Sequence, residues 1–230
     1  MASGDILYSE YLHTEYCMPH AIARSPLGEQ VYLQVLQRIQ QGSIPGGTRI
    51  RDAAIASELG VSRTPVREAL MRLSREGLLS AEAGRGFRLT PLDRAELREI
   101  GSILAALEPL ALDQSPAPDP PRLDRLADIV RRLEQIRGDI TRCIELDDDF
   151  HRVLLEDCPN RRLLALVATL RRSLRRYLHH YLERGGRVSL SSLQHSRITD
   201  SLKKGDRAAA RQLLERKWRR GMDEIESALP

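Results

Sequence analysis

Apolar residues recur along most of this chain at the spacing of one helix face. The first clear pattern comes from Leu27, Val31, Val35 and Ile39, which follow one another at intervals of four residues. This spacing predicts an amphipathic helix, and Gly42 marks its end. Residues 1–25 show no such periodicity, so we expect them to form an N-terminal arm.

Two short helices are predicted next. Asp52 is a candidate cap for a helix over residues 53–59. Ser62 is a candidate N-cap for the helix that follows. The second helix carries a stripe of apolar residues that we expect to be buried, namely Val66, Ala69, Leu70 and Leu73.

The remainder of the chain combines one hairpin with a long helical region. Residues 78–82 and 87–90 are typical of two strands joined by a glycine-containing turn. Thr90 to Asp93, with Pro91 as first helical residue, predicts a capped helix start. Helical patterns then cover residues 91–112, 122–137, 139–157, 160–184, 189–204 and 206–228.

The expected fold class is therefore mainly α. An N-terminal winged helix-turn-helix is expected over residues 26–91, because two short helices at a glycine turn precede a hairpin. An all-α helical bundle is expected over residues 92–230.

Composition excludes several classes of protein. Hydrophobic residues make up 41% of the 230 positions, so global disorder is not expected. No apolar run approaches the roughly 20 residues that a bilayer span needs, and the N-terminus lacks a secretory pattern. The three cysteines form neither a disulfide framework nor a zinc pattern. We expect a cytoplasmic protein with no membrane partner.

Charge is informative through its distribution. The net charge is only +4, but residues 49–88 hold eight arginines, no lysine and five acidic residues. Arginine is the side chain best suited to bidentate contacts with phosphate and guanine. The segment that holds the two short helices and the hairpin is therefore a candidate for binding duplex DNA.

The second short helix is expected to enter the major groove. Arg63 and Arg67 flank its apolar stripe and are the candidates for reading bases. The hairpin turn at Gly84 and Arg85 is a candidate wing in or near the minor groove. A solvated arginine face is the alternative interpretation. Candidate phosphate contacts, which position the protein without reading sequence, are Arg51, Ser62 and Thr64.

The segment 59–70, Leu-Gly-Val-Ser-Arg-Thr-Pro-Val-Arg-Glu-Ala-Leu, followed by Leu73 and Gly77-Leu78, resembles the signature of the GntR family of bacterial regulators. The resemblance covers residues 26–91 and implies a winged helix-turn-helix that acts as a homodimer on roughly palindromic double-stranded operator DNA. Gly46 stands where that family usually has proline, and Ala53-Ala54 where charged residues are common, which leaves the DNA contacts at the latter position open.

Polar residues fall on apolar helix faces in the second half of the chain. Asp147 and His151 share a stripe with Ile144, while His195 and Lys217 lie on the buried faces of two later helices. Leaving such groups unpaired in a core would cost several kcal/mol each. We expect them to meet one another, water, a ligand or a metal.

This arrangement resembles the FCD ligand-sensing domain of the FadR subfamily, and six predicted helices suggest its smaller VanR-like variant. The resemblance rests on Asp147-x-x-Phe150-His151, Asn160, and His195 followed by Gly205-Asp206. In members that bind metal, an Asp and three His hold the ion beside a carboxylate. The resemblance thus implies Asp147, His151 and His195 as ligands of zinc, nickel or manganese.

Two departures leave alternatives open. Lys217 stands at the fourth ligand position, and a protonated lysine has no lone pair for a metal. Leu104 stands where the family often has arginine. Lys217 can instead supply the cation itself, pairing with Asp147 and attracting an anionic effector; a filled structural core is the third possibility. We assign Asp147, His151, His195 and Lys217 to the effector pocket, together with Arg172 from the basic run at residues 171–176.

These observations predict a ligand-responsive transcription regulator without enzymatic activity. The simplest form is a repressor of a metabolic operon, which a small carboxylate effector releases from the DNA. A DNA-architectural protein with a purely structural helical domain is one alternative. A metal-dependent hydrolase is another, with an open fourth position for water. The chain has no HExxH glutamate and no nucleophile motif, which disfavours the hydrolase.

Overall fold

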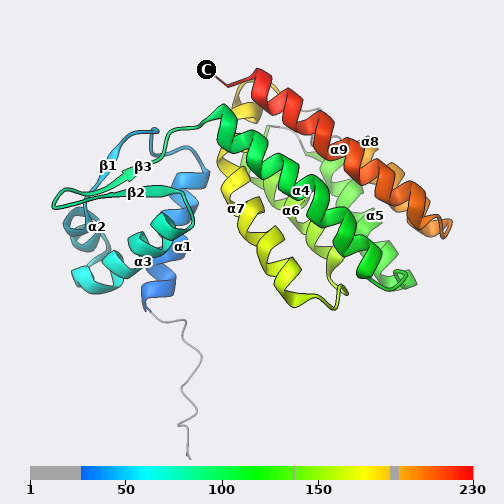
Figure 1. Ribbon diagram of the computed structural model, residues 1–230, viewed down its shortest axis with the longest axis horizontal. Helices are drawn as coiled ribbons and strands as arrows, with labels where there is room; N and C mark the ends of the chain where they lie inside the picture. Colours follow the sequence, from blue (N-terminus) through cyan, green and yellow to red (C-terminus); the bar gives the residue numbers. More distant parts are fainter. Residues whose placement is uncertain (1–26, 137, 187–191, 230) are drawn as a thin grey trace, which may run out of the picture.

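The computed structural model describes residues 27–136, 138–186 and 192–229. The predicted N-terminal arm, residues 1–25, lies outside them. Within these residues the chain forms two lobes, a winged-helix domain and a helical domain (Figure 1). The winged-helix domain comprises α1 (Leu27–Gln40), β1 (Arg49–Ile50), α2 (Asp52–Leu59), α3 (Arg63–Arg75), β2 (Leu79–Glu82) and β3 (Gly86–Leu89).

A small antiparallel sheet completes the winged-helix domain, with strand order β1-β3-β2. The hairpin of β2 and β3 pairs Leu79 with Leu89 and Glu82 with Gly86, which confirms the predicted wing. Strand β1 was not predicted, because two residues show no periodicity. The apolar face of α3 is buried as predicted, and other large residues of this core include Tyr32, Ile39, Leu78 and Phe87.

Two predicted helix starts were wrong. Asp52 is the first residue of α2 and not its cap, and its carboxylate binds Arg63 as well as the Ala53 amide. The first helix of the second domain begins at Arg94, capped by Asp93, whose side chain accepts from the Glu96 amide. Pro91 therefore precedes that helix. Asp93 marks the start of α4 because its carboxylate accepts a hydrogen bond from a first-turn amide that has no partner within the helix.

Six helices form the helical domain, as predicted: α4 (Arg94–Gln114), α5 (Pro120–Gln135), α6 (Ile140–Leu155), α7 (Arg161–Glu183), α8 (Ser192–Lys203) and α9 (Arg207–Ser227). Helices α4 and α9 lie side by side along one edge of the lobe (Figure 1). Between the six helices lies one hydrophobic core, whose most deeply buried members include Leu104, Leu126, Phe150, Leu214 and Ile225. None of the helices in the described residues is long and apolar enough to span a bilayer.

Helix α7 joins the two domains. Gln40, the last residue of α1, donates a hydrogen bond of 3.1 Å from its side-chain amide to the carbonyl oxygen of Arg172. One turn further on, Arg176 donates to the carbonyl oxygen of Thr90, at 2.5 Å, in the segment that links the domains. The Tyr177 hydroxyl donates to the carbonyl oxygen of Asp93 at 3.2 Å. Helix α7 therefore contacts both the winged-helix domain and the segment that links it to the helical domain.

Candidate functional site

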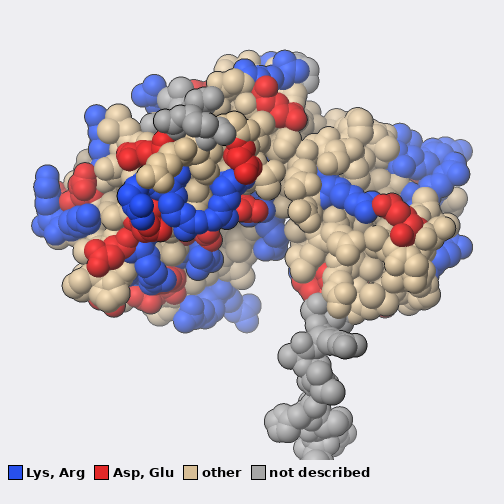
Figure 2. Space-filling model, turned by 180° about the vertical axis from the view of Figure 1, so that it is seen from behind, with Lys and Arg blue, Asp and Glu red and all other residues tan. Residues whose placement is uncertain are grey.

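A concave basic face lies between the outer side of α3 and the wing, with a volume of about 570 Å³. Basic side chains gather at this end of the winged-helix domain, away from the helical domain (Figure 2). Only Asp52 and Glu82 oppose them among the lining residues. The lining arginines are Arg49, Arg51, Arg63, Arg67 and Arg85.

The structure thus places most of the predicted DNA contacts on one surface. Arg51, Arg63, Arg67, Gly84 and Arg85 all line the concave basic face, although they come from three separate segments. The surface carries five arginines against two acidic residues, and such positive charge favours the phosphate backbone of duplex DNA.

Ser62 and Thr64 are exposed at the start of α3 and do not line the hollow. Ser62 occupies the N-cap position with an extended backbone, but its hydroxyl makes no capping hydrogen bond. The hydroxyl and the first amides of α3 are therefore available to a phosphate, which a helix N-terminus favours. This geometry agrees with a positioning contact for both residues.

Arg63 is held by an ion pair before any DNA is present. Its Nη2 lies 3.0 Å from both carboxylate oxygens of Asp52. The hydrogen bond from Arg63 is the main cause that lowers the pKa of Asp52. Because the Arg63 side chain is still 65% exposed, this pair orients the guanidinium without burying it.

Arg49 belongs to the concave basic face but was missed in the sequence. It lies on β1, where it points to solvent while Ile50 points into the core. Its Nη2 lies 3.3 Å from Oε2 of Glu82 on the wing. The inside–outside alternation of Arg49 and Ile50 is the only sequence signal for this strand, and it is too short to be recognised.

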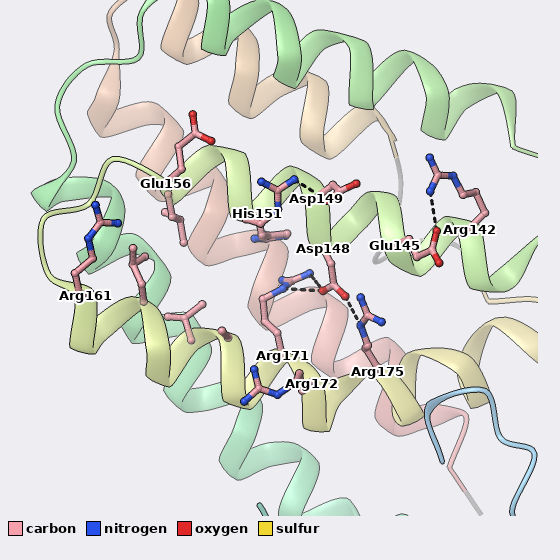
Figure 3. A pocket seen from close by; sticks show the side chains of 15 residues that line it. Arg142, Glu145, Asp148, Asp149, His151, Glu156, Arg161, Arg171, Arg172 and Arg175 are labelled. Carbon is pink, nitrogen blue, oxygen red and sulfur yellow. Dashed lines mark hydrogen bonds and ion pairs between the residues drawn. The ribbon is translucent and has the colours of Figure 1, made fainter. Parts of the chain in front are cut away.

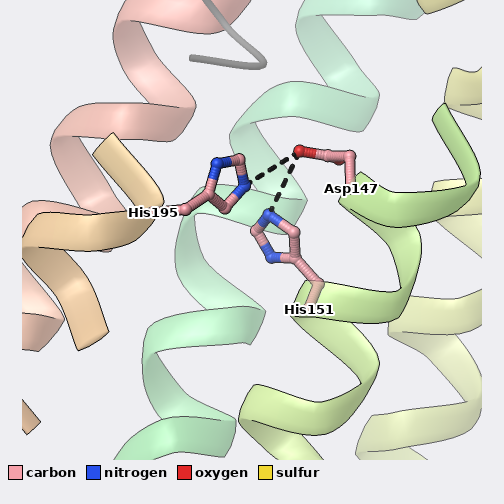
Figure 4. Close-up of side chains that lie close together, drawn as sticks. All are labelled: Asp147, His151 and His195. Atoms are coloured by element: carbon pink, nitrogen blue, oxygen red, sulfur yellow. Dashed lines mark ion pairs between the residues drawn. The ribbon is translucent and has the colours of Figure 1, made fainter. Parts of the chain in front are cut away.

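In the helical domain, Asp147, His151 and His195 converge as predicted (Figure 4). All three are buried, and one possible ligand atom of each lies within 4.8 Å of the others. Nε2 of His195 on α8 lies 3.0 Å from Oδ1 of Asp147 on α6. The Nε2 atom of His151, one turn further along α6, lies 4.0 Å from the same oxygen.

Lys217 of α9 reaches the same point. Its ammonium nitrogen lies 3.3 Å from Oδ1 of Asp147 and 3.0 Å from Nε2 of His151. The lysine is itself buried, with 7% of its surface exposed. The four residues that the sequence singled out on three different helices therefore form one contact group.

Two further charged residues complete this group, and sequence reasoning did not assign them. Arg171 of α7 donates from Nη2 to Oδ2 of Asp147 at 2.7 Å and from Nη1 to Oε1 of Glu108 at 3.3 Å. Glu108 of α4 accepts from Nε1 of Trp218 at 2.7 Å and contacts Nδ1 of His151 at 2.6 Å. We refer to Glu108, Asp147, His151, Arg171, His195 and Lys217 as the buried cluster.

The structure separates Arg172 from the buried cluster but places it in the lining of a larger pocket between α6 and α7. Consecutive residues of a helix point in different directions, and the structure brings Arg171, not Arg172, to Asp147. Arg172 lies toward the winged-helix domain, with Nη2 3.9 Å from Oε1 of Glu76. Glu108 was detectable in the sequence, because it lies four residues after the buried Leu104 on the same face of α4.

Electrostatics define the protonation states of the cluster. Burial alone would raise the pKa of Glu108, but the charges and hydrogen bonds of His151, Arg171 and Trp218 lower it to about 2. Burial also acts to raise the pKa of Asp147, and the charges of Lys217 and Arg171 bring it well below its ordinary value. Both carboxyl groups are therefore ionised at neutral pH.

His151 is neutral under the same conditions. Burial, followed by the charge of Arg171, lowers the pKa of His151 to about 3, against the opposing effect of Glu108. A neutral imidazole has one N–H and one lone pair. Because the Glu108 carboxylate only accepts, Nδ1 of His151 donates to it, and the lone pair of Nε2 faces the ammonium of Lys217.

A divalent metal does not fit this arrangement. An ion held by these side chains would lie about 2.0–2.2 Å from each ligand atom. The ammonium of Lys217 already stands within 3.0 to 3.3 Å of two of those atoms. The void beside Asp147 and Lys217 measures about 10 Å³, which admits no more than one water molecule.

A larger pocket, of about 650 Å³, lies between α6 and α7. We call it the α6–α7 pocket. His151 and Arg171 face it, so the pocket touches the buried cluster at these two side chains (Figure 3). Arg172 lines it as well, whereas Asp147, His195 and Lys217 do not. The remaining apolar lining comes from Leu155, Leu164, Val167 and Ala168.

The lining of the α6–α7 pocket contains more arginines than acidic residues. Six arginines stand against four acidic residues. Arg142, Arg152 and Arg175 each pair with a carboxylate of the same pocket. Arg161 forms no ion pair within the part of the chain that the structure describes, and Arg172 finds its nearest carboxylate in the other domain. The pocket therefore offers guanidinium groups to an anion.

Comparisons with known proteins agree with both halves of this structure. Residues 27–89 match the family described as bacterial regulatory proteins, gntR family, and residues 99–220 match the FCD domain. The HTH-type transcriptional regulator YdhC of Bacillus subtilis is 31% identical over 196 residues, which cover 82% of this chain and 86% of YdhC.

A second relative and a solved structure extend the comparison. A probable D-xylose utilization operon transcriptional repressor of Paenarthrobacter nicotinovorans is 38% identical over 90 residues, covering 39% of this chain and 40% of the relative. The structure of E. coli McbR/YncC matches with a TM-score of 0.78 and 23% identity, over 89% of this chain and 99% of that one. The latter match shows a shared fold.

Proposed function

The chain belongs to the gntR family of bacterial regulatory proteins and carries an FCD domain, and from this premise we propose that it is a repressor that a small carboxylate effector releases from operator DNA. That it is a transcription regulator and not an enzyme follows from the family. The sign of regulation, the effector class and the dimeric state belong to the proposal. The naming of the Paenarthrobacter relative as a repressor supports the sign.

Two copies of the concave basic face are needed on the DNA. A single recognition helix such as α3 presents two candidate base-reading arginines, Arg63 and Arg67. Each bidentate contact to guanine discriminates by about 1–3 kcal/mol. A homodimer doubles this discrimination and places the two heads on half-sites about one helical turn apart.

The effector binds in the α6–α7 pocket in this proposal. Its volume of about 650 Å³ is in the range of sites for small molecules. The guanidinium groups of Arg161 and Arg172 suit a carboxylate, since their fork matches two oxygens at once. The apolar patch of Leu155, Leu164 and Val167 suits a short carbon skeleton between charged ends.

The observation that carries the proposal is that α7 lines the effector pocket and also holds the winged-helix domain. Arg175 pairs with Asp148 in the pocket and donates to Oε1 of Gln40 on α1 at 3.4 Å. The backbone of Arg172 accepts from the same glutamine. A carboxylate that draws these arginines inward therefore favours a different attachment of α1, which changes the spacing of the two DNA-reading heads.

Binding to operator DNA in the presence of candidate effectors tests the proposal. The operator is selected from random duplexes by the native protein, and its affinity is measured by fluorescence anisotropy with a panel of mono- and dicarboxylates, sugar acids included. At least one carboxylate is expected to weaken operator binding by tenfold or more, which corresponds to the usual coupling of about 1–3 kcal/mol between sites.

Matched variants locate the site. Arg161→Gln removes a pocket guanidinium far from the DNA face, and it should retain operator affinity but require more carboxylate for release. Arg131→Gln on α5, whose side chain is 64% exposed outside this pocket, is the control. If the native protein binds its operator and no carboxylate changes that affinity, the effector proposal is wrong and the DNA-architectural alternative gains support.

A further inference from the structure

The buried cluster contains an internal cation at the place where its histidines and aspartate meet. The Lys217 ammonium touches Oδ1 of Asp147 and Nε2 of His151, two of the atoms that would hold a metal. It comes from α9, and the lining of the α6–α7 pocket does not include it. The side chain is thus part of the packed interior rather than a surface group folded inward.

The charges of the buried cluster sum to zero without any added ion. Glu108 and Asp147 supply two negative charges, and Arg171 and Lys217 supply two positive ones. Asp148, which also contacts Arg171, is balanced by its second partner, Arg175. A divalent cation among these residues would leave a double positive charge without a partner. Uncompensated charge in a buried site is strongly unfavourable.

The nitrogen atoms of the two histidines are also engaged. Nε2 of His195 lies 3.0 Å from a carboxylate oxygen of Asp147, and a carboxylate only accepts, so this nitrogen carries a proton. Nε2 of His151 accepts from Lys217, while Nδ1 donates to Glu108. Neither histidine has a lone pair free at the centre of the cluster.

We propose that Lys217 is the resident cation of the Asp147–His151–His195 site, and that this one side chain decides that the helical domain takes no divalent metal. Lysine at this position satisfies Asp147 and His151 permanently, whereas histidine would add a fourth ligand atom, the third nitrogen, from α9. Lys217→His is then expected to create a metal centre from residues already in place, with four ligands of the type that zinc or nickel accepts.

The experiment measures metal directly on untagged, full-length protein. The native protein and Lys217→His are dialysed against zinc, nickel or manganese and then against metal-free buffer, and bound metal is determined by mass spectrometry. Native protein should retain far less than one equivalent, and EDTA should leave its melting temperature unchanged. The Lys217→His variant should retain about one equivalent of zinc or nickel and melt higher with metal than with EDTA.

Two controls separate a built site from a loose one. Lys217→Met removes the ammonium without adding a ligand, and it should bind metal more weakly than Lys217→His. The double variant Lys217→His with His195→Ala should lose the metal that Lys217→His gains. Circular dichroism confirms that each variant has the helical content of the native protein.

The opposite results overturn the inference. One tightly held metal in the native protein, removed by Asp147→Asn, would show that Lys217 does not replace the ion. A folded Lys217→His variant without metal would show that position 217 does not decide the matter. The measurements on the native protein need no variant, so they decide even if Lys217→His does not fold. The inference concerns the same helical domain as the proposed function. Metal content is measured without DNA or effector, so a negative result would refute this inference without refuting the proposed function.

Discussion

Replacing Arg63 or Arg67 with alanine should separate the recognition of sequence from the attraction to DNA in general. Both side chains line the concave basic face and are exposed, so their removal should leave the folded core intact. Arg63 is 65% exposed and its one ion pair, to Asp52, lies at the surface. Such a pair contributes at most about 1 kcal/mol to folding, so the variants should unfold within a few degrees of the native protein.

The expected loss in operator affinity is much larger. Each arginine that contacts guanine through both nitrogens contributes about 1–3 kcal/mol of discrimination. In a dimer every substitution occurs twice, so the loss is about 2–6 kcal/mol, or roughly 30-fold to more than 10⁴-fold. Affinity for random duplex DNA should fall far less, because that binding depends on the total charge and not on individual bases.

Fluorescence anisotropy with operator and random duplexes, each at two salt concentrations, measures both quantities. Arg75→Ala is the matched control, since Arg75 is an exposed arginine near the other end of α3 that does not line the concave face. It should change operator and random binding by the same small factor. The reasoning is refuted if Arg63→Ala and Arg67→Ala behave like Arg75→Ala, with equal losses on both kinds of DNA.

Three further predictions concern coupling and stability. Gln40→Ala removes the side chain that joins α1 to α7. Operator affinity without effector should persist, but the factor by which the effector weakens operator binding should fall; an unchanged factor would contradict the coupling. The stability contributed by ionised Glu108 is complete above pH about 4.5 and lost as pH falls toward about 2, because its folded pKa is the lower one. Urea unfolding of Glu108→Gln should therefore show a lower stability at pH 7, by about 3–5 kcal/mol, and a flatter acid dependence; a parallel pH profile would count against this. Arg122→Leu should cost about 1–3 kcal/mol, since the buried guanidinium binds Asp157 and the Pro116 carbonyl, whereas exposed Arg125→Leu should cost little; similar urea midpoints for the two would be inconsistent with this.

Local chemistry in the sequence was sufficient to predict most of the helices, the wing and the arginines that lie on the exposed side of α3. Val66, Ala69, Leu70 and Leu73 repeat at helical spacing, and one periodicity decides both the helix and the side that it buries. Arg63 and Arg67 then face outward by geometry alone. The same principle placed Asp147 and His151 on the inner face of α6, because polar residues on an apolar stripe must find partners.

What the sequence could not determine is which of those inward residues meet. Lys217 lies 70 positions from Asp147, and their contact at 3.3 Å exists only because α9 packs against the other helices at one rotation and height. Arg171 instead of Arg172 enters the cluster because one residue turns a helical side chain by about 100°. Strand β1 likewise depends on a neighbour in space, the strand β3 with which it pairs. Periodicity along one helix tells which face is buried, whereas the pairing of buried charges depends on distances between helices, and those are set only when the whole core is packed.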